Sequence, residues 1–536
     1  MDGSEYGTIK KIRTHEQSLT LAISKIFKSN SIKVGGLIVC SRVLGLARDS
    51  LLANLLGARE VADAFYTAYR LPNMLRDLVA EGALSSIVVS RLAKTQADAG
   101  EPRTRELIRR LFAFWGTVLV LLSIAGAVAA PWLVRVMASG FKSSAQMELA
   151  ITLTRLVFPY IAFVGLAALT MGILHHYRSF GWASIGSSCS NLTVIVVGLL
   201  LTTFYKGTEW TVVYFVALAT VAGGLTQWLG LWPGLWSKGI SIKPDFRLRD
   251  PEVLKVFLLI GPSVIGVAAV QINVAVNHAY ASHLGEGAIT AIYYAFRVMQ
   301  LPVGIVGVAV STVLLPTLAK AFNEKKDDLF ALEMKRAMVS VSFLSLPAVC
   351  GILVLGDRLL AVLYEHGKFD HESTALTWQA LQGYIIGILP YVYNKNLVQG
   401  YFARNDIRYT VRIALLSISI NALANYLLAF VFHCGVLGLT GGTALVLWSN
   451  FLMLVWGMKR RHGVTILDGQ FFKPVLVVAC WSVLMSLALL AIKSHINMWG
   501  DAISILLLTV VGMVVFGSCW WVSQRFWRFD PRRMLG

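Results

Sequence analysis

Long apolar stretches separated by short polar segments run through most of this chain, from residue 32 to residue 524. A stretch of 18 or more mainly apolar residues is long enough to cross a bilayer as a helix. Short alternating segments, which a membrane β-barrel requires, do not dominate. The pattern therefore predicts an all-α polytopic membrane protein. The fourteen expected transmembrane helices are 32–56, 61–93, 108–137, 147–176, 181–205, 211–236, 252–283, 287–320, 330–356, 374–403, 407–432, 437–458, 472–492 and 501–524.

An internal repeat relates the two halves of the chain. Tyr66–Arg70 matches Tyr293–Arg297 at an offset of 227, and Ser85–Lys94 matches Ser311–Lys320 at an offset of 226. The second expected span thus corresponds to the eighth. We expect two six-helix lobes of the same orientation, related by an axis along the membrane normal, with two extra C-terminal helices outside the repeat.

The domain limits follow from the repeat and from the polar segments around it. The expected parts are a cytoplasmic N-terminal extension (1–31), an N-lobe (32–237), a basic cytoplasmic linker (238–250), a C-lobe (251–461) and a final pair of helices with the C-terminal tail (462–536). The extension fits two alternatives equally, a short basic amphipathic helix on the membrane surface or a tail without fixed structure.

Composition and charge support the membrane class. The chain is 56% hydrophobic and 14% charged, whereas soluble domains carry about 25% charged residues. Its net charge of +19 is concentrated in alternate loops and near the ends of the chain. That distribution follows the positive-inside rule, so we expect both termini in the cytoplasm and no nucleic-acid partner. The six cysteines lack metal-ligand spacing, and we expect no metal site.

The charged residues inside the first two spans carry the strongest functional signal. An arginine at the bilayer centre costs about 2.5–3.5 kcal/mol on insertion scales, so these helices should line a water-filled cavity. Guanidinium groups bind phosphate oxygens in pairs, which favours a transporter of an anionic substrate such as a diphosphate. The alternative is structural pairing of arginine with carboxylate. The arginines are Arg42, Arg48 and Arg76, and the nearby acids are Asp49, Asp63, Asp77 and Glu81.

The acidic residues have two candidate roles. Asp63 and Arg70 are seven residues apart and share a helix face, which predicts an ion pair or a gate. Glu81 precedes Gly82, where another helix could approach closely. Such carboxylates either carry a coupling ion or hold the arginines in place, and we favour the second role, with Asp49 in the same group.

The C-lobe offers fewer charged candidates. Arg297 lies deep in the eighth span and is the repeat partner of Arg70. Its neighbours Phe296 and Gln300 are uncharged, so we expect its charge to be free for substrate. Lys395 lies nearer a helix end, where it can reach the membrane surface, and we interpret it as structural.

Two pairs of asparagines repeat one spacing. Asn421 and Asn425 are four residues apart, as are Asn273 and Asn277. These amides could form a weak cation site, but no carboxylate accompanies them, and hydrogen bonding between helices is the favoured role. The sequence contains no nucleotide-binding loop, nucleophile elbow or paired-carboxylate catalytic site, so we expect a transporter rather than an enzyme. We expect that the protein needs no cofactor, and the sequence does not identify a coupling ion.

Several motifs together resemble the MurJ (MviN) family of lipid II flippases, in the multidrug/oligosaccharidyl-lipid/polysaccharide (MOP) exporter superfamily. The matching segments are Ser41–Asp49, Ala62–Phe65, Leu71–Arg76, Ala80–Ala83, Tyr294–Arg297, His366–Phe369 and Tyr401–Ile407. Two departures stand out, because many relatives carry acidic residues at the positions of Phe296 and Gln300, and residues 1–31 have no counterpart.

The resemblance implies a V-shaped pair of lobes around a central cationic cavity, and a groove at the last two helices for a polyprenyl tail. It implies a monomer in the bacterial inner membrane that carries lipid II, the undecaprenyl-diphosphate-linked peptidoglycan precursor, from the cytoplasmic to the periplasmic leaflet by alternating access. Its partners would be lipid II and membrane lipids. The family's cavity arginines fall on Arg42, Arg48, Arg76 and Arg297, and its acidic positions on Asp63 and Glu81.

Rival classes are less well supported by these residues. Another exporter of the same superfamily, for a polysaccharide lipid or for cationic drugs, is the main alternative. A cation-coupled drug antiporter would need a pocket lined with carboxylates, whereas this cavity is expected to be net basic. A membrane scaffold would not need arginines within its spans.

Overall fold

The computed structural model describes residues 30–79, 83–205, 207–247, 250–493 and 501–527, and these residues form helices and connections without any strand. The first helices are α2 (Asn30–Leu56), α3 (Glu60–Val79), α4 (Ala83–Met137), α5 (Ser144–Val157), α6 (Tyr160–His176), α7 (Phe180–Phe204), α8 (Glu209–Leu229) and α9 (Trp232–Trp236). The others are α10 (Pro251–Ser282), α11 (Ala288–Asn323), α12 (Asp327–Tyr364), α13 (His371–Ala403), α14 (Ile407–Tyr426) with the π-helix η1 (Leu427–Val431), α15 (Gly435–His462), α16 (Gly469–Lys493) and α17 (Asp501–Trp527).

The all-helical membrane architecture is confirmed. Within the described residues, nine helical segments are long and apolar enough to cross a membrane. The helices α2 and α3, which hold the charges of the first two expected spans, are not among the nine. The count of fourteen spans stays a prediction.

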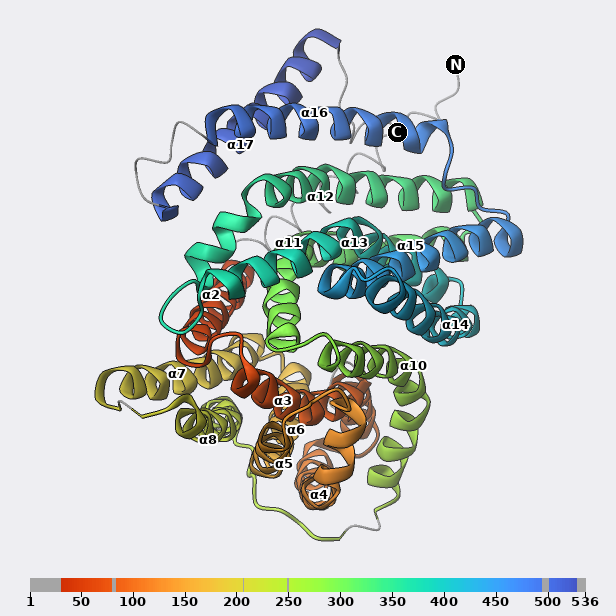
Figure 1. Ribbon diagram of the computed structural model, residues 1–536. Coiled ribbons are helices and arrows are strands. Elements are labelled where there is room, and N and C mark those ends of the chain that lie inside the picture. Colours follow the sequence, from red (N-terminus) through yellow and green to blue (C-terminus); the bar gives the residue numbers. More distant parts are fainter. Residues whose placement is uncertain (1–29, 80–82, 206, 248–249, 494–500, 528–536) are drawn as a thin grey trace, which may run out of the picture.

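The helices form two packed groups (Figure 1). One group, here called the N-lobe, consists of α2 to α9, and the second, the C-lobe, of α11 to α15. Helix α10 belongs to both, since it packs against α4 and α3 on one side and against α14 on the other. Helices α16 and α17 lie outside the C-lobe, next to α12. Two parallel repeats therefore meet along α2, α3, α10 and α11.

The second expected span, 61–93, corresponds to α3 and the first part of α4, and its continuity as one helix stays a prediction because residues 80–82 lie outside the described residues. Helix α4 continues through the expected loop 94–107 into the third span, which the sequence did not indicate. Its backbone departs from helical geometry at Gly100, where φ is 76° and ψ is 178°. Hydropathy locates apolar segments, but it does not show that a polar segment next to them continues the helix beyond the membrane.

The fourth expected span, 147–176, is present as the apolar segment Ser144–His176, which consists of two helices. Helix α5 ends at Val157 and α6 begins at Tyr160, with Pro159 at the N-cap of α6. The junction is buried in the N-lobe, because Val157 and Phe158 are fully shielded from solvent. A proline at a helix start lacks only an amide hydrogen that has no helical partner, so the division strains the backbone little.

The basic linker between the lobes is held against α4 by its own acidic residues. Asp250 accepts hydrogen bonds from Arg103, at 2.7 Å, and from Arg110, while Asp245 accepts one from Arg110 at 3.1 Å. Burial alone would raise the pKa of Asp250, but these bonds and the amide of Glu252 outweigh it and lower that pKa. The start of α10 is therefore fixed to the N-lobe.

Candidate functional site

The centre of the candidate site is a shared carboxylate on α2. Asp49 is buried, and its Oδ1 accepts hydrogen bonds from Nε and Nη2 of Arg48 at 3.0 and 2.7 Å. The Nη1 of Arg48 also donates to Asn191 of α7 at 3.1 Å, and the Asn191 amide donates to the carbonyl of Ser41 at 3.1 Å. The structural pairing that was the alternative for Arg48 is therefore present.

Arg297 reaches the same carboxylate from the C-lobe. Its Nε lies 3.4 Å from Oδ2 of Asp49, and its Nη2 donates to the hydroxyl of Tyr293 at 2.7 Å. The expectation that the charge of Arg297 is free was wrong, because a carboxylate from the distant helix α2 lies beside it. Asp49 thus joins one arginine of each lobe.

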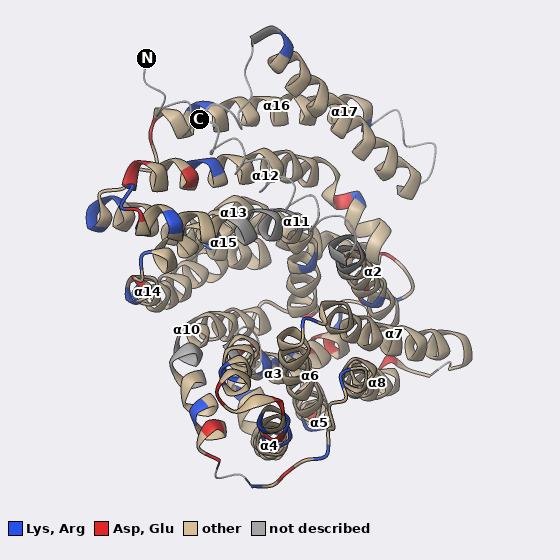
Figure 2. Cartoon of the chain, turned by 180° about the vertical axis from the view of Figure 1, so that it is seen from behind, with Lys and Arg blue, Asp and Glu red and all other residues tan. Residues whose placement is uncertain are grey.

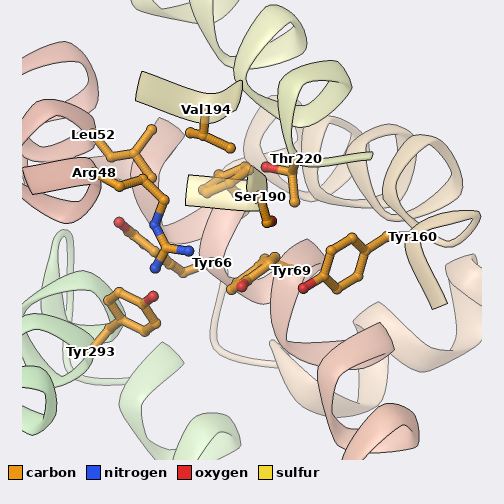
Figure 3. Close-up of a pocket in the computed structure, with 10 residues that line it drawn as sticks. Arg48, Leu52, Tyr66, Tyr69, Tyr160, Ser190, Val194, Thr220 and Tyr293 are labelled. Atoms are coloured by element: carbon orange, nitrogen blue, oxygen red, sulfur yellow. The ribbon is translucent and has the colours of Figure 1, made fainter. Parts of the chain in front are cut away.

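Tyrosine rings surround this pair of arginines. Figure 3 shows the guanidinium of Arg48 among the rings of Tyr66, Tyr69 and Tyr293, at a narrow pocket that Leu52, Val194 and Thr220 complete. Tyr66 stacks on Tyr293 with ring centroids 4.1 Å apart, and its hydroxyl donates to that of Tyr294 at 2.7 Å. The sequence reasoning used these tyrosines only to align the repeat and missed them as site residues.

Their position follows from the repeat itself. Tyr66 and Tyr293 are equivalent residues of the two halves, and residues near an axis that relates two repeats meet their own equivalents. The contact of 4.1 Å between equivalent rings therefore locates the axis at this point, between α3 and α11. The repeat alignment was the signal that could have found the site.

Arg76 forms a second carboxylate pair farther along α3. Its Nη2 lies 2.7 Å from Oδ1 of Asp77, and Oδ2 of Asp77 accepts a hydrogen bond from Gln271 of α10 at 3.3 Å. A quarter of the Arg76 side chain is exposed.

The side chain of Arg42 on α2 lies against α11 of the opposite lobe. The side chain is exposed, and a Cβ at Gly304 of α11 would overlap its guanidinium. Glycine at this position therefore allows the arginine to lie against the C-lobe. None of the residues that the structure describes forms a hydrogen bond or ion pair with Arg42.

The remaining basic candidates are spread more widely. Arg70 is half-buried on α3, one residue after Tyr69 of the pocket. Lys395 is exposed on α13, with its Nζ 4.8 Å from the ring centroid of Tyr391. Glu81 lies outside the described residues. Figure 2 shows most Lys and Arg at helix ends and in connections, with a few on α2, α3 and α11 where the lobes meet.

Asp63 does not pair with Arg70 in the described structure. Its buried carboxylate accepts hydrogen bonds from the amides of Gly287 and Thr290, both at 2.8 Å, and from the Thr290 hydroxyl at 2.6 Å. Gly287 is the N-cap of α11 and has no side chain to cap the helix. A carboxylate from α3 supplies the missing cap and faces the positive end of the helix dipole, so it ties the two lobes together.

A second set of contacts closes the same end of the junction. We call it the interlobe clasp, formed by the connection His366–Asp370 of the C-lobe on Asn54, Arg59 and Glu209 of the N-lobe. Lys368 pairs with Glu209, Arg59 lies 3.1 Å from Asp370, and the Lys368 amide donates to the carbonyl of Asn54 at 3.0 Å.

The clasp depends on two glycines with left-handed backbone. Gly57 has φ of 66° and Gly367 has φ of 60°. A Cβ at Gly57 would meet the carbonyl of Lys368, and one at Gly367 would meet that of Asn54. Both positions therefore require glycine for its conformation and for close approach. At the N-cap of α13, hydrogen bonds from the amide and hydroxyl of Ser373, and from Arg59, lower the pKa of Asp370.

The asparagines join helices α10, α14 and α15. Asn425, which is fully buried, donates to Asn277 of α10 at 2.6 Å and to Asn421 at 3.2 Å, and Asn277 donates to Thr443 of α15 at 3.1 Å. The hydrogen bonding between helices that the sequence favoured is thus present. In the described part of the chain, no three His, Cys, Asp or Glu residues lie together as they would to hold a metal ion.

Comparison with known proteins supports the arrangement. The family model described as "Lipid II flippase MurJ" matches residues 52–511. The chain belongs to the MurJ family. A lipid II flippase MurJ of Burkholderia cenocepacia is 34% identical over 80% of this chain and 83% of its own length. A probable lipid II flippase MurJ of Vibrio cholerae is 30% identical over 93% of this chain and 95% of its own length.

Solved structures agree with this family at the level of the fold. A lipid II flippase MurJ in an inward closed conformation matches with a TM-score of 0.76 and 22% identity, over 93% of this chain and 99% of that one. An inward-facing multidrug resistance MATE transporter of the MOP superfamily matches with a TM-score of 0.64 and 16% identity, over 81% and 98%. This MurJ-family protein therefore shares the MOP exporter fold, and it is a multi-pass membrane protein of a transporter family.

Proposed function

We propose that this protein is a lipid II flippase, which moves the undecaprenyl-diphosphate-linked peptidoglycan precursor from the cytoplasmic to the periplasmic leaflet of the bacterial inner membrane. Membership of the MurJ family carries the proposal, because curated relatives with that name match most of the chain. The function includes no catalytic step, and the protein works as a monomer without a cofactor.

The cluster at the lobe junction supplies the chemistry for an anionic head group. Arg48 and Arg297 share one carboxylate, so two guanidinium charges face one negative charge. Arg42 and the exposed part of Arg76 add positive charge on α2 and α3. A diphosphate that enters the junction would accept hydrogen bonds from the guanidinium groups, which stay charged throughout the physiological pH range.

The state of the transport cycle follows from which end is closed. The clasp and the Asp63 cap close the end of the junction that contains Gly57, Gly287 and Gly367. The connections at this end carry few cations, and the positive-inside rule assigns it to the periplasm and both termini to the cytoplasm. Substrate would then enter from the cytoplasm, and the clasp would open in the other half of the cycle.

Energy for the cycle would come from a gradient across the membrane. A charge moved across the membrane potential gains about 2.3 kcal/mol per 100 mV, and the described site holds several arginines that could respond to it. The asparagine cluster carries no carboxylate, so we propose that it links α10, α14 and α15 rather than binding a coupling cation.

The test is depletion of the protein in its own bacterium, with lipid II sidedness read by a periplasmic enzyme that cleaves the head group. We expect depleted cells to accumulate lipid II that the enzyme cannot reach. The wild-type gene should restore cleavage, and Arg48→Gln should not. Arg247→Gln, which removes an exposed charge from the linker, is the matched control. Undiminished cleavage in fully depleted cells would overturn the proposal.

A further inference from the structure

A group of exposed cations lies at the end of α14 and α15 opposite the clasp. Arg408 and Arg412 are exposed on α14, and Arg460 is exposed on α15. Trp456 beside them is 58% exposed, and the guanidinium of Arg460 lies over its indole ring at 5.4 Å. The site at the lobe junction uses none of these residues.

The two helices present these side chains on one side. Tyr409 joins the helices, because its hydroxyl donates to the carbonyl of Met453 at 3.0 Å and a Cβ at Gly457 would overlap its ring. Arg408 and Arg412 flank Tyr409 on one side of α14, four residues apart, as Trp456 and Arg460 flank Gly457 on α15. Helices α14 and α15 are antiparallel neighbours that meet at Tyr409 and Gly457. The two arginines of α14 therefore lie on the same side of the helix pair as Trp456 and Arg460.

The charge of this group is not balanced within the described protein. The nearest carboxylate along the chain, Asp406, already accepts from Arg461 at 3.0 Å and lies 3.1 Å from Nε2 of His462. None of the described residues forms an ion pair or hydrogen bond with Arg408 or Arg412. Three arginines and an exposed indole therefore form a patch of excess positive charge.

An apolar surface leads directly into the patch. On α14 the exposed fractions of Leu415, Leu416 and Leu423 are 49%, 51% and 60%, and on α15 those of Leu445 and Leu452 are 50% and 56%. Such leucines face lipid chains in a membrane protein. The arginines begin where the leucines end, and tryptophan favours the boundary between lipid chains and head groups.

We propose that Arg408, Arg412, Trp456 and Arg460 bind the head group of an anionic phospholipid, such as phosphatidylglycerol, in the leaflet at this end. The guanidinium groups contact the lipid phosphate in the paired geometry that arginine provides. The indole packs against the glycerol region, and the leucines contact the acyl chains. Under the orientation proposed above, this is the cytoplasmic leaflet, but the binding does not depend on transport.

The experiment titrates the purified full-length protein in detergent with phosphatidylglycerol or phosphatidylcholine and counts bound lipids by native mass spectrometry. The test variant is Arg408→Gln/Arg412→Gln/Arg460→Gln. The matched control, Lys238→Gln/Lys243→Gln/Arg247→Gln, removes three exposed charges from the linker. We expect the test variant to bind phosphatidylglycerol at least about tenfold more weakly, because each basic residue near a membrane adds to the attraction, and the control to bind as the wild type does.

Wild-type binding of phosphatidylglycerol by the test variant would overturn the proposal, and so would either of two further results. One is equal loss in both triple variants, which would mean that net charge alone governs binding. The other is wild-type binding of phosphatidylcholine as tight as that of phosphatidylglycerol. The single variants Arg412→Gln and Trp456→Phe should each weaken binding in part, and they keep the test valid if the triple variant does not fold. These lipid-binding measurements test the proposal whether or not the protein proves to transport lipid II.

Discussion

At the scale of single residues, the most informative side chain is Asp49, because one buried carboxylate holds two arginines from different lobes. Arg48 contacts it from the same helix, and Arg297 contacts it across the junction at 3.4 Å. Like charges near each other repel unless an opposite charge lies between them. The carboxylate therefore allows the two guanidinium groups to face the same space.

Asp49→Asn tests this role while it preserves the size of the side chain. We expect the variant to lose about 1.5–3 kcal/mol of stability, the usual range for hydrogen bonds to charged groups. Lipid II transport should fall as well, because the arginines lose their common position. Thermal unfolding and the periplasmic cleavage assay measure the two effects. Asp328→Asn, at an exposed position on α12, is the control, and equal behaviour of both variants would contradict the role of Asp49.

Arg76→Lys tests whether the guanidinium geometry matters beyond its charge. Lysine keeps the positive charge and can still pair with Asp77, but it cannot donate two parallel hydrogen bonds to phosphate. We expect normal insertion and a transport rate reduced about tenfold or more, the effect of losing roughly one charged hydrogen bond. Transport at the wild-type rate would show that charge alone is needed at this position.

At the scale of elements, helix α11 depends on the opposite lobe for its N-terminal cap. Gly287 provides no side chain, and the carboxylate of Asp63 on α3 takes that place. The interlobe clasp adds the connection between α12 and α13 to the same end of the junction. Both devices must release together if the lobes separate there.

Reversal of one ion pair tests the clasp. In a protein without its six native cysteines, a cysteine at Ile289, which is 4% exposed on α11, reports opening of this end to an impermeant thiol reagent. We expect Lys368→Glu to increase the labelling rate several-fold, because it places like charges together, at a cost of about 1 kcal/mol. The swapped variant Glu209→Lys/Lys368→Glu should restore protection. Rapid labelling of the swapped protein would mean that the pair does not hold the clasp closed.

At the scale of the whole molecule, two repeats meet at an axis between α3 and α11, where equivalent tyrosines stack. One end of the junction is closed by the cap and the clasp, and α10 connects the lobes through its contacts with both. This arrangement predicts that movement of one lobe against the other exposes the arginine cluster alternately to the two sides.

A reversible crosslink tests that movement. Cysteines at Lys94 of α4 and Lys320 of α11, at the end opposite the clasp, would be joined with a cleavable bifunctional reagent. We expect the crosslinked protein to stop transport and to resume it after reduction. A pair at Lys94 and Asp98, both on α4, should crosslink without effect. Continued transport by the locked protein would exclude alternating access by the two lobes.

The sequence alone determined the helical membrane class, the repeat and the arginines at Arg42, Arg48, Arg76 and Arg297. These properties are local, because hydropathy is a sum over a window of residues and the cost of a charge in lipid depends on that residue. The family motifs are equally local, and the family that they indicate was confirmed by a family model that matches residues 52–511. The N-lobe residues of the candidate site could therefore be proposed without coordinates, and their roles stay predictions.

Only the tertiary structure decided the partners of these residues. Spacing paired Asp63 with Arg70, but the open N-terminus of α11 offers two amides and a hydroxyl, and it binds the carboxylate instead. Arg297 has no carboxylate among its sequence neighbours, and its charged partner is Asp49, some 250 positions earlier in the chain. A buried charge pairs with the group that the packing of distant helices places beside it. The packing depends on the whole fold, so a window of sequence does not predict the partner.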